Sequence, residues 1–139
     1  ELTRRLETPL NMSDTRGFLF HEAANFLQMN AVRLIRGTVR KIGITGLKKQ
    51  MSLAEGFQRF CEIGLAGNSA LNAGNLHVIM SSLNCTYFEY WMPKEVHQWG
   101  VKKQLKINEN GNLDAPTDPG LGIELDEEWI AAHKVATLS

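Results

Sequence analysis

Five positions lie where the sequence predicts parallel strands to end. They are Asp14, Thr38, Glu62, Ile63 and Glu89. In parallel sheets and barrels, functional groups gather at the carboxyl ends of the strands, so these positions are the first candidates for a site. Carboxylates at such positions can bind Mg²⁺ or transfer protons.

Three charged side chains near the predicted strand ends have both a functional and a structural interpretation. Glu89 lies in the middle of an aromatic segment, where an unpaired buried charge would be costly, so it is either a site residue or half of a structural ion pair. Adjacent residues of a strand face opposite ways, so Glu62 points either to the strand-end site or toward the helices. Arg36 offers a forked donor that suits a carboxylate, with structural pairing as the alternative.

Short β-like runs alternate with longer helical runs, a pattern typical of βα units and a parallel sheet. Strands are expected at 10–13, 32–36, 60–63 and 87–91. Helices are expected to end near residue 7 and to span 15–29, 45–57, 68–83 and 127–137, with N-caps at Thr45, Asn68 and Asp126. Residues 102–113 are expected to form an antiparallel excursion that turns at Asn110-Gly111. This α/β pattern suits a small doubly wound sheet or part of a barrel, and periodicity does not choose between them.

Charge and hydropathy exclude several classes of partner. The 15 basic and 15 acidic residues balance to zero, which gives no electrostatic reason to expect nucleic acid. No apolar run approaches the roughly 20 residues that cross a bilayer. Cys61 and Cys85 are interpreted as free thiols of a cytoplasmic protein, because an offset of three residues between neighbouring strands, roughly 10 Å, is too long for a disulfide.

A long motif near the C-terminus carries a family resemblance. Residues 111–124 read GNLDAPTDPGLGIE and match the pattern G-x-L-x-x-P-x-x-P-G-L-G-x-E. Upstream, the segments 6–10, 43–46, 64–69 and 87–91 resemble the fifth barrel strand, the turn after the sixth strand, the loop after the seventh and the eighth strand of the same family. The chain thus resembles the mandelate racemase and muconate-lactonizing enzyme branch of the enolase superfamily.

The resemblance implies a fold and a metal. Residues 1–97 would be the C-terminal portion, about four βα units, of a (β/α)7β TIM-like barrel, and 98–139 a tail segment that returns toward a capping domain absent from this chain. Members bind Mg²⁺ through three carboxylates and stabilise an enediolate. Asp14 matches the third of these ligands, although Asp at this position also suits the N-cap of the helix that follows. The other two ligands and the lysine base would lie outside the chain.

The resemblance also indicates site residues. Racemases of this family carry an Asp–His dyad on strands six and seven, where this chain has Thr38 (or Gly37 in an ungapped match) and Ile63. Neither side of the dyad can therefore ionise, which argues against racemisation by two opposed bases. Glu89 matches a position that hydrogen-bonds the substrate carboxylate or enediolate. Glu89 and Glu62 are the catalytic candidates, Arg36 and Thr38 the substrate-binding candidates.

Two functional hypotheses follow. The first is part of a Mg²⁺-dependent sugar-acid dehydratase, active on a carboxylate sugar only when complete. The alternative is a non-catalytic fragment or degenerate relative that acts as a structural or assembly module. The chain begins at Glu1, within an expected helix, so the expected partner is the remaining N-terminal part of the barrel or a second copy in a homo-oligomer.

Overall fold

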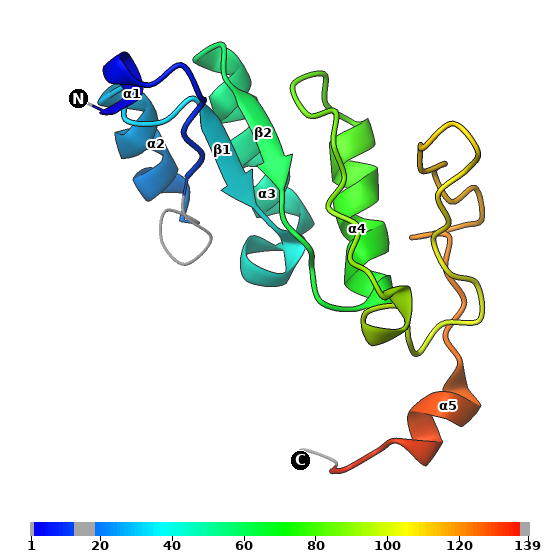
Figure 1. Cartoon of the computed structure of the whole chain (residues 1–139). Coiled ribbons are helices and arrows are strands. Elements are labelled where there is room, and N and C mark those ends of the chain that lie inside the picture. Colours follow the sequence, from blue (N-terminus) through cyan, green and yellow to red (C-terminus); the bar gives the residue numbers. More distant parts are fainter. Residues whose placement is uncertain (1, 13–18, 137–139) are drawn as a thin grey trace.

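A short parallel sheet lies at the centre of the molecule. In the computed structural model, which describes residues 2–12 and 19–136, β1 (Leu34–Gly37) pairs with β2 (Phe60–Ile63), with Leu34 opposite Phe60 and Gly37 opposite Ile63. Single parallel bridges add a segment on each side, Asn11 to Leu34 and Ile63 to Phe88. Four extended segments therefore run side by side in chain order (Figure 1).

One short helix precedes the first of these extended segments, and the other helices follow them along the chain. The helices are α1 (Leu2–Arg5), α2 (Phe20–Gln28), α3 (Val39–Gly56), α4 (Ser69–Met80), the 3-10 turn η1 (Lys94–Val96) and α5 (Glu127–Ala132). α3 contacts both strands and also α2 and α4. Figure 1 shows an open arrangement, with α1 and α2 at one end, the sheet and α3 next, α4 beyond, and the tail with α5 at the far end. None of the helices in the described ranges is long and apolar enough to span a membrane.

The expected α/β class with a short parallel sheet is confirmed, and the strand at 60–63 has the expected bounds. Within the described residues, the strands expected at 10–13 and 87–91 are represented by single bridges at Asn11 and Phe88, and residue 13 lies outside the described part of the chain. Each of these two segments pairs with a described neighbour on one side only, so few ladder hydrogen bonds hold it. Their place in a closed barrel stays a prediction, as does the division at residue 97.

The beginning of α3 differs from the expected helix at 45–57. The chain already turns helically at Val39, with Thr38 as the N-cap residue, and Ile42 N–H donates to Thr38 O. Gly43 then breaks the helical conformation with φ 69°, a value that favours glycine, before the helix resumes. Thr45 is therefore an exposed residue within the helix, and the prediction that it caps the helix is wrong.

Two other caps are confirmed. Asn68 Oδ1 accepts from Leu71 N–H at the start of α4, and Asp126 Oδ1 accepts from Trp129 N–H at the start of α5, both at 2.9 Å. Both helices end earlier than expected, at Met80 and Ala132. The helix expected at 15–29 corresponds to α2, which begins at Phe20, and residues 13–18 lie outside the described part of the chain.

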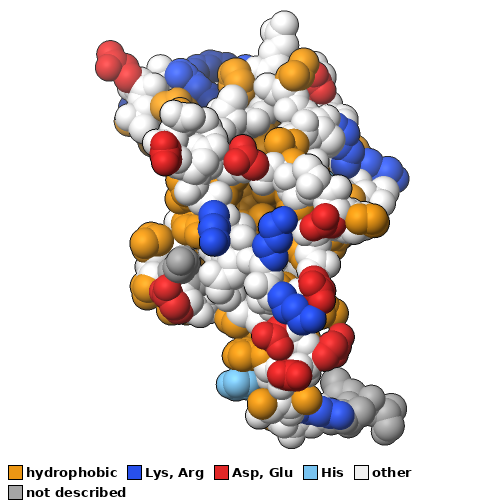
Figure 2. Space-filling view, turned by 90° about the vertical axis from the view of Figure 1, so that its right-hand side faces the viewer, with side chains coloured by type: hydrophobic (Ala, Val, Ile, Leu, Met, Phe, Trp, Pro, Cys, Tyr) orange, Lys and Arg blue, Asp and Glu red, His pale blue; other side chains and the backbone are white. Residues whose placement is uncertain are grey.

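The tail contains the expected antiparallel excursion. Ile107 pairs with Leu113. In the turn between them, Gly111 has a φ angle of 78° and its N–H donates to Asn108 O. His77 Nε2 of α4 lies 3.1 Å from Leu121 O, which links the tail to the body of the molecule. On the face of the molecule shown in Figure 2, acidic and basic side chains lie close together.

The core lies between the sheet and the helices and contains both thiols. Cys61 and Cys85 are buried and free, as predicted. The reason given for that prediction was wrong, because the Ile63–Phe88 bridge places Cys85 about one residue, not three, from the position opposite Cys61. Burial, with smaller contributions from Cys85 and Glu55, raises the pKa of the Cys61 thiol to about 12.

We expect Cys61 to resist alkylation in the folded protein. A rise in pKa from 9.0 to about 12 lowers the reactive thiolate fraction near neutral pH by about 1000-fold. Iodoacetamide labelling at pH 8, followed by peptide mass spectrometry, should modify Cys61 rapidly in urea and at least about 100-fold more slowly in buffer. Equal rates in the two conditions would contradict the buried position.

Candidate functional site

A cleft lies near the carboxyl ends of the strands, with a volume of about 200 Å³. It is lined by Arg36, Glu62, Ile63, Tyr87, Phe88 and Glu89. Arg36 and Glu62 are register partners on adjacent parallel strands, so their side chains emerge on the same face of the sheet. Three of the predicted site residues, Arg36, Glu62 and Glu89, are therefore brought together.

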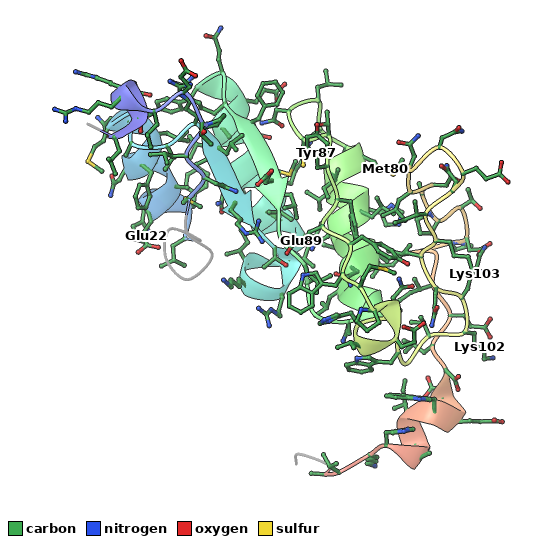
Figure 3. All side chains as sticks on the ribbon, viewed as in Figure 1. Glu22, Met80, Tyr87, Glu89, Lys102 and Lys103 are labelled. Carbon is green, nitrogen blue, oxygen red and sulfur yellow. The ribbon has the colours of Figure 1, made fainter. Side chains whose placement is uncertain are left out.

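The Glu89 carboxylate is the most connected group of the cleft. Its Oε2 accepts from Arg36 Nη2 at 2.6 Å and from Leu65 N–H at 2.9 Å, and its Oε1 accepts from Trp91 Nε1 at 3.1 Å. Figure 3 shows Glu89 near the carboxyl end of β2, on the segment that passes in front of α4. Because all three partners are donors, both oxygen atoms act as acceptors.

Arg36 lies close against the loop that follows β2. A Cβ atom at Gly64 would come within 3.0 Å of Arg36 Nη2, so a residue larger than glycine would push the guanidinium away from this position. Gly64 N–H also donates to Gly37 O at 3.0 Å, which continues the pairing of the two strands beyond their ends. The absence of a side chain at Gly64 therefore permits the Arg36–Glu89 ion pair in its observed place.

Glu62 faces the cleft rather than the helices. It lines the cleft, and its Oε2 accepts from Asn11 Nδ2 at 2.8 Å. Asn11 belongs to the extended segment on the other side of β1, so this hydrogen bond spans β1. The two carboxylates of the cleft thus have different partners: Glu62 is held by a neutral amide and Glu89 by a guanidinium.

Thr38 lies beneath the cleft, among side chains of the interior. Only 1% of it is exposed, and it is not one of the residues that line the cleft. Asn75 of α4 lies beside it: Asn75 Nδ2 donates to Gly64 O at 2.8 Å and lies 3.4 Å from Thr38 Oγ1, while Asn75 Oδ1 accepts from Val39 N–H at 2.9 Å. This single buried amide joins the segments that follow β1 and β2.

Sequence reasoning missed the asparagines of α4. Asn72 Oδ1 accepts from Ala66 N–H at 2.9 Å, so Asn72 and Asn75 both hold the loop 64–67 from below. Both are buried, in a helix whose other buried residues are mainly apolar or small. Two amides three residues apart lie on one helix face, and this spacing within an apolar run was the signal that could have found them.

The described residues do not form a Mg²⁺ site by themselves. No cluster of three or more His, Cys, Asp or Glu side chains occurs among residues 2–12 and 19–136. Of the two carboxylates at the cleft, Glu89 is occupied by Arg36, and a cation beside a guanidinium would be repelled. Asp14, the predicted metal ligand, lies outside the described residues.

Comparison with known proteins gives the family. The model of the enolase C-terminal domain-like family matches residues 1–129, and the chain therefore belongs to this family. Among curated proteins, none matches the chain.

Solved structures agree with this assignment. A structure from Pseudovibrio sp., provisionally named a mandelate racemase/muconate lactonizing enzyme, has a TM-score of 0.91 at 26% identity over 97% of this chain and 36% of its own. A mandelate racemase/muconate lactonizing enzyme from Jannaschia sp. CCS1 has a TM-score of 0.82 at 25% identity over 99% of this chain and 35% of its own. A 2-chloromuconate cycloisomerase from Rhodococcus opacus 1CP shares the fold, with a TM-score of 0.78 at 20% identity over 97% of this chain and 37% of its own. The chain thus spans about a third of the length of these proteins.

We expect Asn75→Ala to destabilise the fold strongly. The substitution leaves Val39 N–H and Gly64 O without the partner that holds them, and unpaired buried polar groups are costly. Urea unfolding should show a loss of about 2–4 kcal/mol. The control Asn25→Ala changes an exposed asparagine of α2 and should cost less than about 0.5 kcal/mol. Equal effects of the two substitutions would contradict the role of Asn75.

Proposed function

We propose that the protein that carries this chain is a Mg²⁺-dependent sugar-acid dehydratase, and that the chain supplies part of its active site. The observation that supports the proposal most directly is the group of Arg36, Glu62 and Glu89 at one cleft near the strand ends. A guanidinium binds a carboxylate, and a carboxyl group beside it can take part in the proton transfers that elimination of water requires.

The missing dyad supports a lyase rather than a racemase. Racemisation requires a proton donor or acceptor on each face of the substrate carbon, and the two dyad positions hold Thr38 and Ile63. Ile63 cannot transfer protons, and Thr38 is buried beneath the cleft. Dehydration requires one base for the α-proton and one acid for the departing hydroxide, so it tolerates this loss better.

The contacts suggest different roles for the two carboxylates. Among the described residues, Glu62 is held by the neutral amide of Asn11, which leaves it the better placed to exchange a proton with a substrate. Glu89 accepts from three donors and orients Arg36 toward the carboxylate end of the substrate. In the complete protein, Asp14 would bind Mg²⁺ together with ligands from outside this chain, and the metal would stabilise the negative charge that follows α-proton removal.

A structural or assembly module is the second candidate. Several large side chains are exposed, among them Leu83 at 90%, Met92 at 75% and Tyr87 at 73%. Exposed apolar surface of this kind marks contact with another polypeptide. The segments around Asn11 and Phe88 also leave sheet edges to be covered. These features fit a partner under either hypothesis.

A substrate screen distinguishes the two candidates. The complete protein should convert at least one acid sugar in the presence of Mg²⁺, and EDTA should abolish the conversion. Glu62→Gln should lower kcat by about 100-fold or more, whereas Glu89→Gln should also raise KM, because it releases Arg36. Absence of conversion with every acid sugar, in a protein that binds Mg²⁺, would favour the assembly module.

We expect the 139 residues alone to associate or to require a partner. The exposed edges and apolar side chains described above would be covered by a second copy or by further polypeptide. Light scattering on the purified chain should give a mass above that of one copy. A stable, monodisperse monomer without affinity for other parts of the protein would contradict this expectation.

A further inference from the structure

His97 lies outside the cleft but contacts two of the groups that support it. Its Nδ1 atom lies 3.2 Å from Gly67 O, in the loop that follows β2. Its ring packs edge to face against Trp91, with centroids 4.5 Å apart and planes 85° apart. Sequence analysis assigned no role to this residue, and the proposed dehydration does not use it.

The contact with Gly67 defines which ring nitrogen carries the proton. A carbonyl oxygen only accepts hydrogen bonds, so the proton must be on Nδ1 for this bond to form. Nε2 is buried and has no hydrogen-bond partner among the described residues. Gly67 has φ +107°, a conformation that suits glycine, and it is this backbone that presents the carbonyl to the ring.

His97 closes a ring of contacts around Glu89. On one side, Trp91 Nε1 donates to Glu89 Oε1, and the Trp91 ring packs against the imidazole of His97. On the other side, Leu65 N–H donates to Glu89 Oε2, and Gly67 of the same loop accepts from Nδ1 of the imidazole through its carbonyl oxygen. The backbone of His97 is also held, because Ser69 Oγ at the start of α4 donates to His97 O at 3.4 Å.

We propose that His97 is a positioning residue that fixes the Trp91 indole and the loop 64–67 relative to each other. It acts through these two groups on Glu89, and through Glu89 on the guanidinium of Arg36. Its Nδ1–H holds the loop and its ring supports the indole, so loss of the side chain loosens two of the three donors of Glu89, Leu65 N–H and the Trp91 indole, at once. The prediction for kinetics rests on the proposed function, whereas the prediction for geometry does not.

The first test measures geometry in the complete protein without substrate. A ¹⁵N spectrum of the histidine side chains should show His97 protonated at Nδ1 and bare at Nε2. The Trp91 indole N–H, assigned with Trp91→Phe, should lose about 10-fold of its protection from hydrogen exchange in His97→Ala. A proton on Nε2 alone, or unchanged protection in His97→Ala, would overturn the proposal whether or not the protein is a dehydratase.

The second test compares variants that keep or remove the donor. Asparagine places an amide near the position of Nδ1, so His97→Asn should retain KM for the acid-sugar substrate within about 2-fold, whereas His97→Ala should raise it about 3- to 10-fold. The matched control is His77→Ala, because His77 also contacts a backbone carbonyl, that of Leu121, but outside this ring. An equal rise of KM in His77→Ala, or no rescue by His97→Asn, would show a merely structural role and overturn the proposal.

Discussion

The carboxylate of Glu89 is the point at which three separate segments of the chain meet. Its donors come from β1, from the loop after β2 and from the segment that follows Phe88. None of these contacts is deeply buried, since the side chains of Arg36 and Glu89 are 21% and 32% exposed, so each is individually modest. Their effect lies in geometry: one anion with three donors defines where the strand ends lie relative to one another.

The loop 64–67 is held from two sides by different chemistry. From below, the amides of Asn72 and Asn75 bind Ala66 N–H and Gly64 O in the interior. From above, Glu89 binds Leu65 N–H at the edge of the cleft. Neutral amides satisfy the buried backbone without the desolvation cost of a charge, whereas the charged group lies where water reaches it. α4 therefore holds the loop through buried neutral amides, and Glu89 holds it through a charged group at the edge of the cleft.

The sequence predicted best those features that depend on neighbours along the chain. The caps at Asn68 and Asp126 and the strand at 60–63 follow from side chains within a few residues. The lengths of the extended segments around Asn11 and Phe88 depend on pairing across the sheet, and the strand expected at 87–91 was overestimated. The start of α3 was missed because the helical turn before Gly43 is separated from the rest by one positive φ angle, which periodicity does not detect.

The candidate site could be predicted in part, for a related reason. Glu89 stood out as a charge within an aromatic segment, and the cost of leaving it unpaired correctly indicated a partner or a role. Which partner it has could not be read, because Arg36 is 53 residues away in sequence. The contacts of Asn75 were not predicted, because an amide in a helix has many possible partners until the strand ends packed against it are known.

At the two positions that the family resemblance assigns to an Asp–His dyad, the chain has Thr38 and Ile63. With those positions unable to ionise, the acidic groups at the cleft are Glu62 and Glu89. Three donors contact the Glu89 carboxylate: the Arg36 guanidinium, Leu65 N–H and the Trp91 indole N–H. Among the described residues, the partner of the Glu62 carboxylate is the neutral amide of Asn11. The two glutamates of the cleft are therefore held by different chemistry, Glu89 by a charged and two neutral donors and Glu62 by a neutral amide.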